Sequence, residues 1–176
     1  MNDRKIIWVR GQKGNEGKSW FQSYLQSLYG AHRVARFDIT NKTSDLLQIM
    51  SRSELTTTNV FLFNQQHCVP SEECCYSLFE MIKDGYASAP KFHGALLRIK
   101  TPNVIVVFVN EYPDFSKLSQ DRWACFQIKN TGDLLGVTAN EARQNQRTET
   151  GKKCRGCTEI YNREGQVVKR IFDAPT

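Results

Sequence analysis

The stretch Gly-Gln-Lys-Gly-Asn-Glu-Gly-Lys-Ser, residues 11–19, decides the fold of this chain. It follows a short apolar run, residues 6–9, and precedes a segment, residues 20–29, whose apolar side chains recur at helical spacing. A strand, a glycine-rich loop and a helix in this order are the context of a phosphate-binding loop. Glycines let consecutive backbone N–H groups turn toward phosphate oxygens, and the positive end of the following helix favours an anion. The stretch therefore predicts a nucleotide-binding site after the first strand.

Within this loop, Lys18 is expected to reach the β- and γ-phosphates of ATP, and Ser19 to offer its hydroxyl to Mg²⁺. In the commonest pattern a glycine precedes the glycine of the Gly-Lys pair by five residues, but Gln12 stands at that position. Because the nearest earlier glycine is one residue further back, we expect a slightly larger loop. The residues predicted to bind the nucleotide are Gly11, Gly14, Asn15, Glu16, Gly17, Lys18, Ser19 and Trp20.

The composition, with 176 residues of which 40% are hydrophobic and 24% charged, is typical of a soluble globular protein. The formal net charge of +6 favours an anionic partner, and nucleic acid is favoured in addition to ATP. The sequence contains no run of about 18 apolar residues, and its start lacks the apolar core of a signal peptide. We therefore expect an intracellular protein without a membrane partner, whose six cysteines are free thiols.

The rest of the pattern alternates strands with helices and predicts an α/β fold with a central parallel sheet. Residues 58–63 and 103–109 are unbroken apolar runs, as in strands buried on both faces. A short helix at 46–50 has Thr43 or Ser44 as a plausible cap. The other expected elements are strands at 33–39 and 124–128, the latter as the final strand, a helix at 75–83 that ends at Asp84-Gly85, and a possible hairpin within 86–100.

The strand before Asn64 and Gln65 is where phosphate-loop enzymes carry an aspartate that holds the Mg²⁺ shell. Neither amide carries charge, so Mg²⁺ would lose the Coulombic part of that contact and no general base is present at either position. Glu72 and Glu73 are possible substitutes, although they also suit the first turn of the next helix. Asp38, at the end of an earlier strand, is a further candidate for the missing charge.

Other polar residues follow the predicted strands. Asn110 ends the most apolar strand, where α/β sheets bind ligands, so it is a candidate to contact the γ-phosphate or the attacking water. Arg122 beside an acid is either a surface ion pair or an arginine finger donated across a subunit boundary. Lys91 and His93 lie either on a solvated loop or on a basic finger that contacts nucleic-acid phosphates.

Together these residues resemble the superfamily 3 helicase domain of replication initiator (Rep) proteins from small circular single-stranded DNA viruses. The resemblance covers roughly residues 5 to 128, and the longer loop ending in Glu-Gly-Lys is similar to the nanovirus and satellite branch. It rests on the phosphate loop, the strand ending in Asn64, and segments 79–85, 91–94, 104–110 and 118–123. It implies a three-layer P-loop NTPase (AAA+-like) fold and an ATP- and Mg²⁺-dependent ring, usually a hexamer, that moves on single-stranded DNA during rolling-circle replication in the host nucleus.

The resemblance also implies roles for single residues. Lys18 and Ser19 take the Walker A roles, Asn110 is the sensor asparagine, and Arg122 is the finger acting on the neighbour's ATP. Lys91 and His93 fall on the hairpin that touches DNA. Asn64 departs from the family, because it stands where a Walker B acid is usual and would be the second metal-site residue beside Ser19. The family's nicking domain is expected to be missing, so the chain is either an excised helicase fragment or a Rep relative that lost nicking.

The sequence is expected to divide into an ATPase domain, residues 1–130, and a basic extension, residues 131–176. In the extension, residues 140–143 suit a short helix, residues 144–153 are polar and expected to be mobile, and residues 158–172 suit a hairpin. Cys154 and Cys157 have zinc-knuckle spacing, but no second ligand pair follows them.

Two functions remain open at this point. The first is an ATP-hydrolysing helicase, and the second is a nucleotide-gated DNA-binding or oligomerisation module with little hydrolysis, as the uncharged Asn64-Gln65 pair would suggest. A small-molecule kinase with the same loop is less favoured, because the chain lacks an obvious arginine-rich lid.

Overall fold

The computed structural model describes residues 4–12, 15–40, 42–65, 74–89, 95–151, 157–161 and 167–172. The chain divides into two compact units, Met1–Ala139 and Asn140–Thr176, which are described separately. Within the described ranges, no helix has the length and apolar character needed to cross a membrane.

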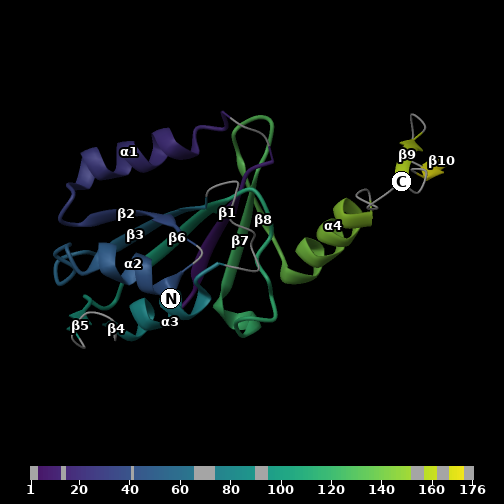
Figure 1. The fold of residues 1–176 in the computed structure, drawn as a ribbon. Helices are drawn as coiled ribbons and strands as arrows, with labels where there is room; N and C mark the ends of the chain where they lie inside the picture. Colours follow the sequence, from purple (N-terminus) through teal and green to yellow (C-terminus); the bar gives the residue numbers. More distant parts are fainter. Residues whose placement is uncertain are drawn as a thin grey trace. The chain divides into compact units, whose positions relative to one another are not determined.

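A mixed sheet of six strands forms the centre of the first unit (Figure 1). Its strand order is β2-β3-β6-β1-β7-β8. Every neighbouring pair is parallel except β7 and β8, which are antiparallel. The strands are β1 (Ile6–Arg10), β2 (Val34–Ile39), β3 (Val60–Gln65), β6 (Val104–Val109), β7 (Trp123–Ile128) and β8 (Leu134–Val137). The α/β prediction is therefore confirmed, and the predicted parallel sheet is extended by one antiparallel edge strand.

The expectation that residues 124–128 form the final strand of the sheet is wrong, because β8 follows. A tight turn returns the chain: Gly132 has a φ of 87°, and its N–H donates to the Lys129 carbonyl at 2.9 Å. The Lys129 N–H donates to the Asp133 carbonyl at 2.8 Å and closes the turn. The two leucines that begin β8 are exposed, so the strand lacks the buried alternation by which sequence reasoning finds strands.

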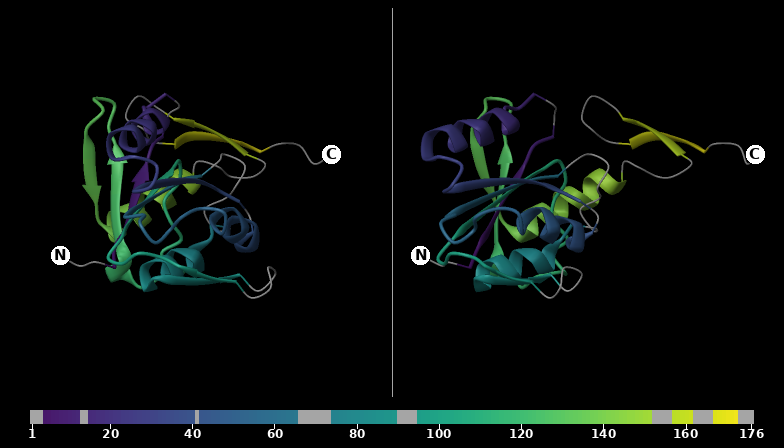
Figure 2. Two further views of the ribbon diagram at one scale, coloured as in Figure 1. Left: turned by 90° about the vertical axis from the view of Figure 1, so that its left-hand side faces the viewer. Right: turned by 60° about the vertical axis from the view of Figure 1, so that its left-hand side comes forward.

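Helices cover both faces of the sheet. Helix α1 (Lys18–Tyr29) lies on one face, and α2 (Thr43–Met50) and α3 (Tyr76–Asp84) lie on the other (Figures 1 and 2). The chain moves outward from β1 to β2 and then back through β3 to β6. Right-handed crossovers in opposite directions place their helices on opposite faces, which accounts for the layers.

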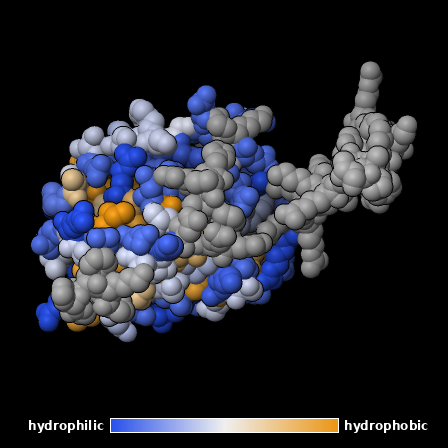
Figure 3. Space-filling model, viewed as in Figure 1, coloured by the Kyte–Doolittle hydropathy of each residue, from blue (hydrophilic) through white to orange (hydrophobic). Residues whose placement is uncertain are grey.

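The core is mainly aliphatic on one face of the sheet and rich in aromatic rings on the other. Under α1, buried Val9, Val34, Leu62 and Phe108 pack together. On the opposite face the fully buried Trp8 ring stacks on Tyr76 at 6.1 Å and meets Trp123 edge-on at 5.7 Å. The viewed surface of the first unit is largely hydrophilic, with apolar side chains in small patches (Figure 3). Burial of Phe61, Leu62 and Phe63 in succession confirms that β3 is covered on both faces.

Two helix ends differ in how well the sequence predicted them. Helix α2 begins at Thr43 with Lys42 as its N-cap and no side-chain cap bond, so the predicted Thr43 or Ser44 cap is wrong. The Ser44 hydroxyl instead donates to its neighbour Asp45. Helix α3 ends at Asp84 with Gly85 as its C-cap, as predicted: Gly85 has a φ of 87°, and its N–H donates to the Ile82 carbonyl.

The predicted hairpin after α3 is confirmed. Strands β4 (Tyr86–Ala89) and β5 (Ala95–Arg98) pair antiparallel, with Tyr86 opposite Arg98. Lys91 and His93, which were predicted to contact DNA, lie outside the described residues.

The second unit contains α4 (Ala139–Gly151), β9 (Cys157–Tyr161) and β10 (Val167–Phe172). Strands β9 and β10 pair antiparallel, which confirms the predicted carboxyl-terminal hairpin. Helix α4 extends well beyond the short helix expected at 140–143 and includes most of the polar segment that followed it. Its sequence has few apolar residues, so its helical period is faint.

Three cysteines in the described part, Cys74, Cys75 and Cys125, are buried free thiols, as expected. Burial raises the pKa of Cys125 to about 12, so this thiol stays protonated and unreactive at neutral pH. Within the described ranges, no group of three or more His, Cys, Asp or Glu side chains is placed to hold a metal ion. Cys154 and the side chain of Cys157 lie outside the description, so the zinc-knuckle hypothesis stays a prediction.

Candidate nucleotide-binding site

The glycine-rich loop leaves the sheet at its centre. Strand β1 lies between β6 and β7, and the Gly11 N–H donates to the Val109 carbonyl at the end of β6 at 2.9 Å. From β1 the chain connects to strands on one side of the sheet, beginning with β2, and it later forms β7 on the other side of β1. The carboxyl end of β1 is therefore the point where the strand order reverses. Open α/β sheets bind ligands outside the carboxyl ends of their strands at such a point.

Two residues near the end of the glycine-rich loop have a left-handed backbone. Asn15 and Gly17 have φ angles of 65° and 79°, both in the left-handed region. The Gly17 carbonyl accepts the Phe21 N–H at 2.9 Å and so begins α1. Left-handed residues in a loop turn backbone N–H groups toward a common concave side, which suits an anion. Gly14 lies outside the described residues.

The Glu16 carboxylate lies against Gly11, between Lys18 and the Gln12 backbone. Glu16 Oε2 accepts a hydrogen bond from Lys18 Nζ at 2.9 Å, and Glu16 Oε1 accepts the Gln12 backbone N–H at 2.9 Å. A Cβ atom at position 11 would collide with both the Glu16 carboxylate and Lys18 Nζ, so these two side-chain ends lie directly against the Gly11 backbone and would have to shift for any other residue. An ammonium and a backbone N–H thus converge on two anionic oxygens. The same donors would fit the oxygens of a phosphate group.

Asn110 belongs to this cluster. Its Oδ1 accepts a second hydrogen bond from Lys18 Nζ at 3.0 Å. Its backbone carbonyl accepts Arg10 Nε at 3.1 Å, and the Arg10 guanidinium lies 4.3 Å from the centre of the Tyr112 ring. Tyr112 in turn donates its hydroxyl to Gln127 on β7 at 2.9 Å. Asn110 is therefore held in place by neighbours on β1 and β7.

Sequence reasoning missed Arg10. This side chain is only 5% exposed, although a charged residue rarely remains buried without strong partners. A charged residue at the end of an otherwise apolar strand, directly before the glycine loop, was the available signal.

Asn64 and Gln65 are on opposite faces of the sheet. Successive strand residues alternate between faces, and Gln65 is buried while Asn64 is half-buried. Asn64 shares the α1 face with Asp38 on β2, and its Nδ2 donates to Asp38 Oδ1 at 3.1 Å. Of the two predicted catalytic amides, Asn64 is therefore the one on the face that carries α1 and its first residues, Lys18 and Ser19.

Arg122 lies at the amino ends of the parallel strands, whereas the glycine loop lies at their carboxyl ends. It ends a 3₁₀ turn, Gln120–Arg122, directly before β7. The parallel register pairs Trp123 with Ile6 and Gln127 with Arg10. Four strand residues span about 13 Å, so the Arg122 backbone is at least that far from the glycine loop of its own chain.

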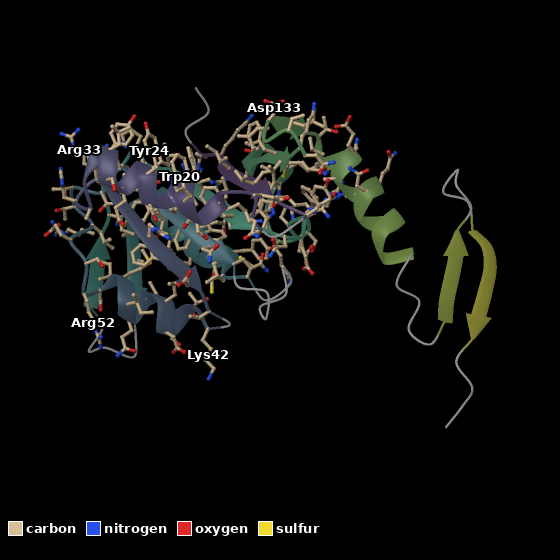
Figure 4. The ribbon with its side chains drawn as sticks, turned by 90° about the horizontal axis from the view of Figure 1, so that it is seen from above. Trp20, Tyr24, Arg33, Lys42, Arg52 and Asp133 are labelled. Atoms are coloured by element: carbon tan, nitrogen blue, oxygen red, sulfur yellow. The ribbon has the colours of Figure 1, made fainter. Side chains whose placement is uncertain are left out.

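Trp20, a predicted nucleotide contact, is 70% exposed on α1. Its ring stacks on the Tyr24 ring at 5.4 Å, one helical turn along (Figure 4). Ser19, the predicted metal ligand of the loop, is exposed beside it at the second position of α1.

The ion pair in the loop gives a first prediction. We expect Glu16→Gln to raise the affinity for a nucleoside triphosphate about tenfold, because the Lys18 ammonium then loses its competing charged partner. Titration of the metal-free chain with a non-hydrolysable ATP analogue in a calorimeter measures this change. Glu80→Gln on α3 removes the same charge elsewhere and is expected to leave the affinity unchanged. Weaker binding by Glu16→Gln would contradict this account and make Glu16 a ligand contact.

Comparisons with known proteins place the chain beside one group. No protein-family model matches it. It is 36% identical over 120 residues to Para-Rep C3 of Milk vetch dwarf C3 alphasatellite, which covers 68% of this chain and 39% of that protein. It is 34% identical over 122 residues to Para-Rep C7 of Faba bean necrotic yellows C7 alphasatellite, covering 69% of this chain and 41% of that protein.

A third relative, Para-Rep C10 of Milk vetch dwarf C10 alphasatellite, is 33% identical over 122 residues, again 69% of this chain and 41% of the relative. The chain thus spans about two fifths of the length of the curated relatives it matches. This consistent likeness to alphasatellite Para-Rep proteins supports a Rep-like protein of circular single-stranded DNA viruses.

Proposed function

We propose that the chain is the ATPase part of a Rep-like replication protein: a P-loop helicase domain that hydrolyses ATP and moves on single-stranded DNA as a ring. The observation that carries the proposal is the convergence of Lys18 Nζ and the Gln12 N–H on two carboxylate oxygens above Gly11. The place of this cluster at the carboxyl end of the central strand supports it further. The net charge of +6 is consistent with a nucleic-acid partner.

The reaction would be transfer of the γ-phosphoryl group to water. Lys18 and the Gln12 N–H hold the phosphate oxygens once Glu16 has moved aside, and the amino end of α1 adds favourable potential. The Asn110 amide, which Arg10 holds by its carbonyl, orients the attacking water. A Mg²⁺ ion, when bound, neutralises charge on the phosphates. The residues at hand fit such an ion, since the Asp38 and Asn64 oxygens and the Ser19 hydroxyl are the oxygen ligands that Mg²⁺ takes.

The position of Arg122 supports the oligomer. Arg122 lies at the amino ends of the strands and does not reach the glycine loop of its own chain. It can reach the loop of a neighbour that packs head to tail. Repeated head-to-tail contacts close into a ring when the rotation allows it. Transition-state charge on the neighbour's phosphate is then stabilised by Arg122.

The second candidate is a nucleotide-gated DNA-binding or oligomerisation module with little hydrolysis. The uncharged Asn64 favours it, because the carboxylate expected there in hydrolytic phosphate-loop enzymes is absent from that position.

Steady-state ATP turnover distinguishes the two candidates. We expect turnover by the purified chain that rises more than linearly with protein concentration, because each site needs a neighbour, and that rises again when single-stranded DNA is added. Equal amounts of duplex DNA serve as the control for charge alone. Tight ATP binding without turnover at any concentration would favour the nucleotide-gated module, and absence of ATP binding would contradict both.

A further inference from the structure

We propose that Asp38 supplies the negative charge of the magnesium site, in place of the acid that is missing at position 64. This inference rests on the proposed ATPase function and assigns one residue of its metal site. Three observations carry it: the register of β2 against β3, the hydrogen bond between the two side chains, and a contact that aligns β2 with α1.

The register places Asp38 beside Asn64. The two residues are direct partners on neighbouring parallel strands, so their side chains point to the same face of the sheet. Both lie near the carboxyl ends of their strands. The carboxylate is thus displaced from the expected position by one strand, which is about 4.8 Å.

The hydrogen bond fixes the orientation of the Asn64 amide. A carboxylate only accepts hydrogen bonds, so the Asn64 nitrogen is the atom directed at Asp38 Oδ1, at 3.1 Å. The Asn64 oxygen is then directed away from Asp38. The pair therefore presents a neutral amide oxygen and a charged carboxylate side by side, and both are ligand types that Mg²⁺ accepts directly or through water.

The contact between β2 and α1 aligns Asp38 with Ser19. Arg36 Nη1 donates to Ser23 Oγ at 2.8 Å, so the end of the Arg36 side chain reaches Ser23 and brings this part of β2 close to the level of Ser23 on α1. Helix α1 begins near the carboxyl ends of the parallel strands and runs back toward their amino ends, antiparallel to the strands. Two residues along β2 advance about 6.7 Å, and four residues along α1 advance about 6 Å.

Asp38 is two residues beyond Arg36 on β2, and Ser19 is four residues before Ser23 on α1. Both steps lead toward the carboxyl edge, so Asp38 is brought to the level of Ser19. The Ser23 hydroxyl also donates to the Ser19 carbonyl at 3.1 Å, so the same hydroxyl contacts both Arg36 on β2 and Ser19 at the start of α1. On this alignment the loop serine and the displaced carboxylate lie at a similar level on the α1 face of the sheet, where the two protein ligands of a phosphate-loop magnesium site are expected.

The test measures metal binding rather than turnover. Mn²⁺, which replaces Mg²⁺ and is visible by electron paramagnetic resonance, is titrated into the chain with a non-hydrolysable ATP analogue. We expect Asp38→Asn to weaken Mn²⁺ binding about 10- to 100-fold, while the affinity for the analogue without metal does not fall. The matched control is Asp45→Asn, which removes an exposed carboxylate from α2 and is expected to change neither value.

A double variant returns the charge to its usual position. We expect Asp38→Asn with Asn64→Asp to recover Mn²⁺ affinity to within about threefold of the unchanged chain, since an acid is then present on β3. Recovery also excludes misfolding as the cause of the loss in Asp38→Asn. Unchanged Mn²⁺ affinity in Asp38→Asn would overturn the inference and turn attention to Glu72→Gln and Glu73→Gln. Failure of the unchanged chain to bind the analogue at all would instead overturn the proposed ATPase function.

Discussion

Replacing Lys18 with alanine is expected to weaken ATP binding about 100-fold, equivalent to about 2.7 kcal/mol. The Lys18 ammonium is the positive charge at the centre of the site, 15% exposed and bonded to both Glu16 and Asn110. Its removal leaves the Glu16 carboxylate in the loop without its cationic partner, so a phosphate would meet a bare negative charge. Equilibrium titration with a fluorescent ATP analogue measures the loss.

The control for this prediction is Lys5→Ala. Lys5 is exposed just before β1, at the opposite edge of the sheet, so its removal changes the net charge equally without touching the loop. Thermal unfolding of both variants checks that the fold is retained. If Lys18→Ala binds the analogue as tightly as the unchanged chain, the glycine loop does not hold the phosphates and the proposed function is wrong.

Arg122→Ala is expected to lower ATP turnover at least about 1,000-fold while leaving ATP binding within a few-fold of normal. The Arg122 backbone lies far from the glycine loop of its own chain, so we expect its effect on turnover to come through a neighbouring subunit. Arg33→Ala is the matched control, because Arg33 is an exposed arginine directly before β2, at the same edge of the sheet. It is expected to leave turnover without DNA unchanged.

Mixing two inactive variants tests whether Arg122 acts between subunits. In a mixture of equal parts Lys18→Ala and Arg122→Ala, about one interface in four joins an intact loop to an intact arginine in a head-to-tail ring. We expect turnover to reappear at roughly that fraction. No recovery in a mixture in which energy transfer between differently labelled variants shows joint oligomers would mean that Arg122 has a structural role within its own subunit.

Most of the fold could be predicted from the sequence because its signals are local. The glycine loop and the strand at 104–109 are recognisable from their composition. The end of α3 is recognisable from Gly85, its C-cap, whose positive φ favours glycine. Strand β8 could not be found this way. Its stability comes from pairing with β7, a contact between segments, and its exposed leucines leave no alternation to recognise.

The candidate site was predictable in its residue types and not in its pairings. That Asn64 and Gln65 face opposite sides follows from the two-residue period of a strand and was available from the sequence. The neighbour of Asn64 was not, since Asp38 meets it only through the register of β2 against β3. The contact between Glu16 and Lys18 likewise spans Gly17, whose left-handed backbone is a feature of the folded loop.

The stacked, exposed ring of Trp20 on α1 gives the chain an intrinsic fluorescent probe near the glycine loop. Of its three tryptophans, Trp8 and Trp123 are buried, with 0% and 7% exposure, whereas Trp20 is 70% exposed. A small neutral quencher such as acrylamide therefore extinguishes mainly the emission of Trp20. Because this residue directly follows Ser19 at the start of α1, the quenchable part of the intrinsic fluorescence monitors events at the glycine loop without an attached dye.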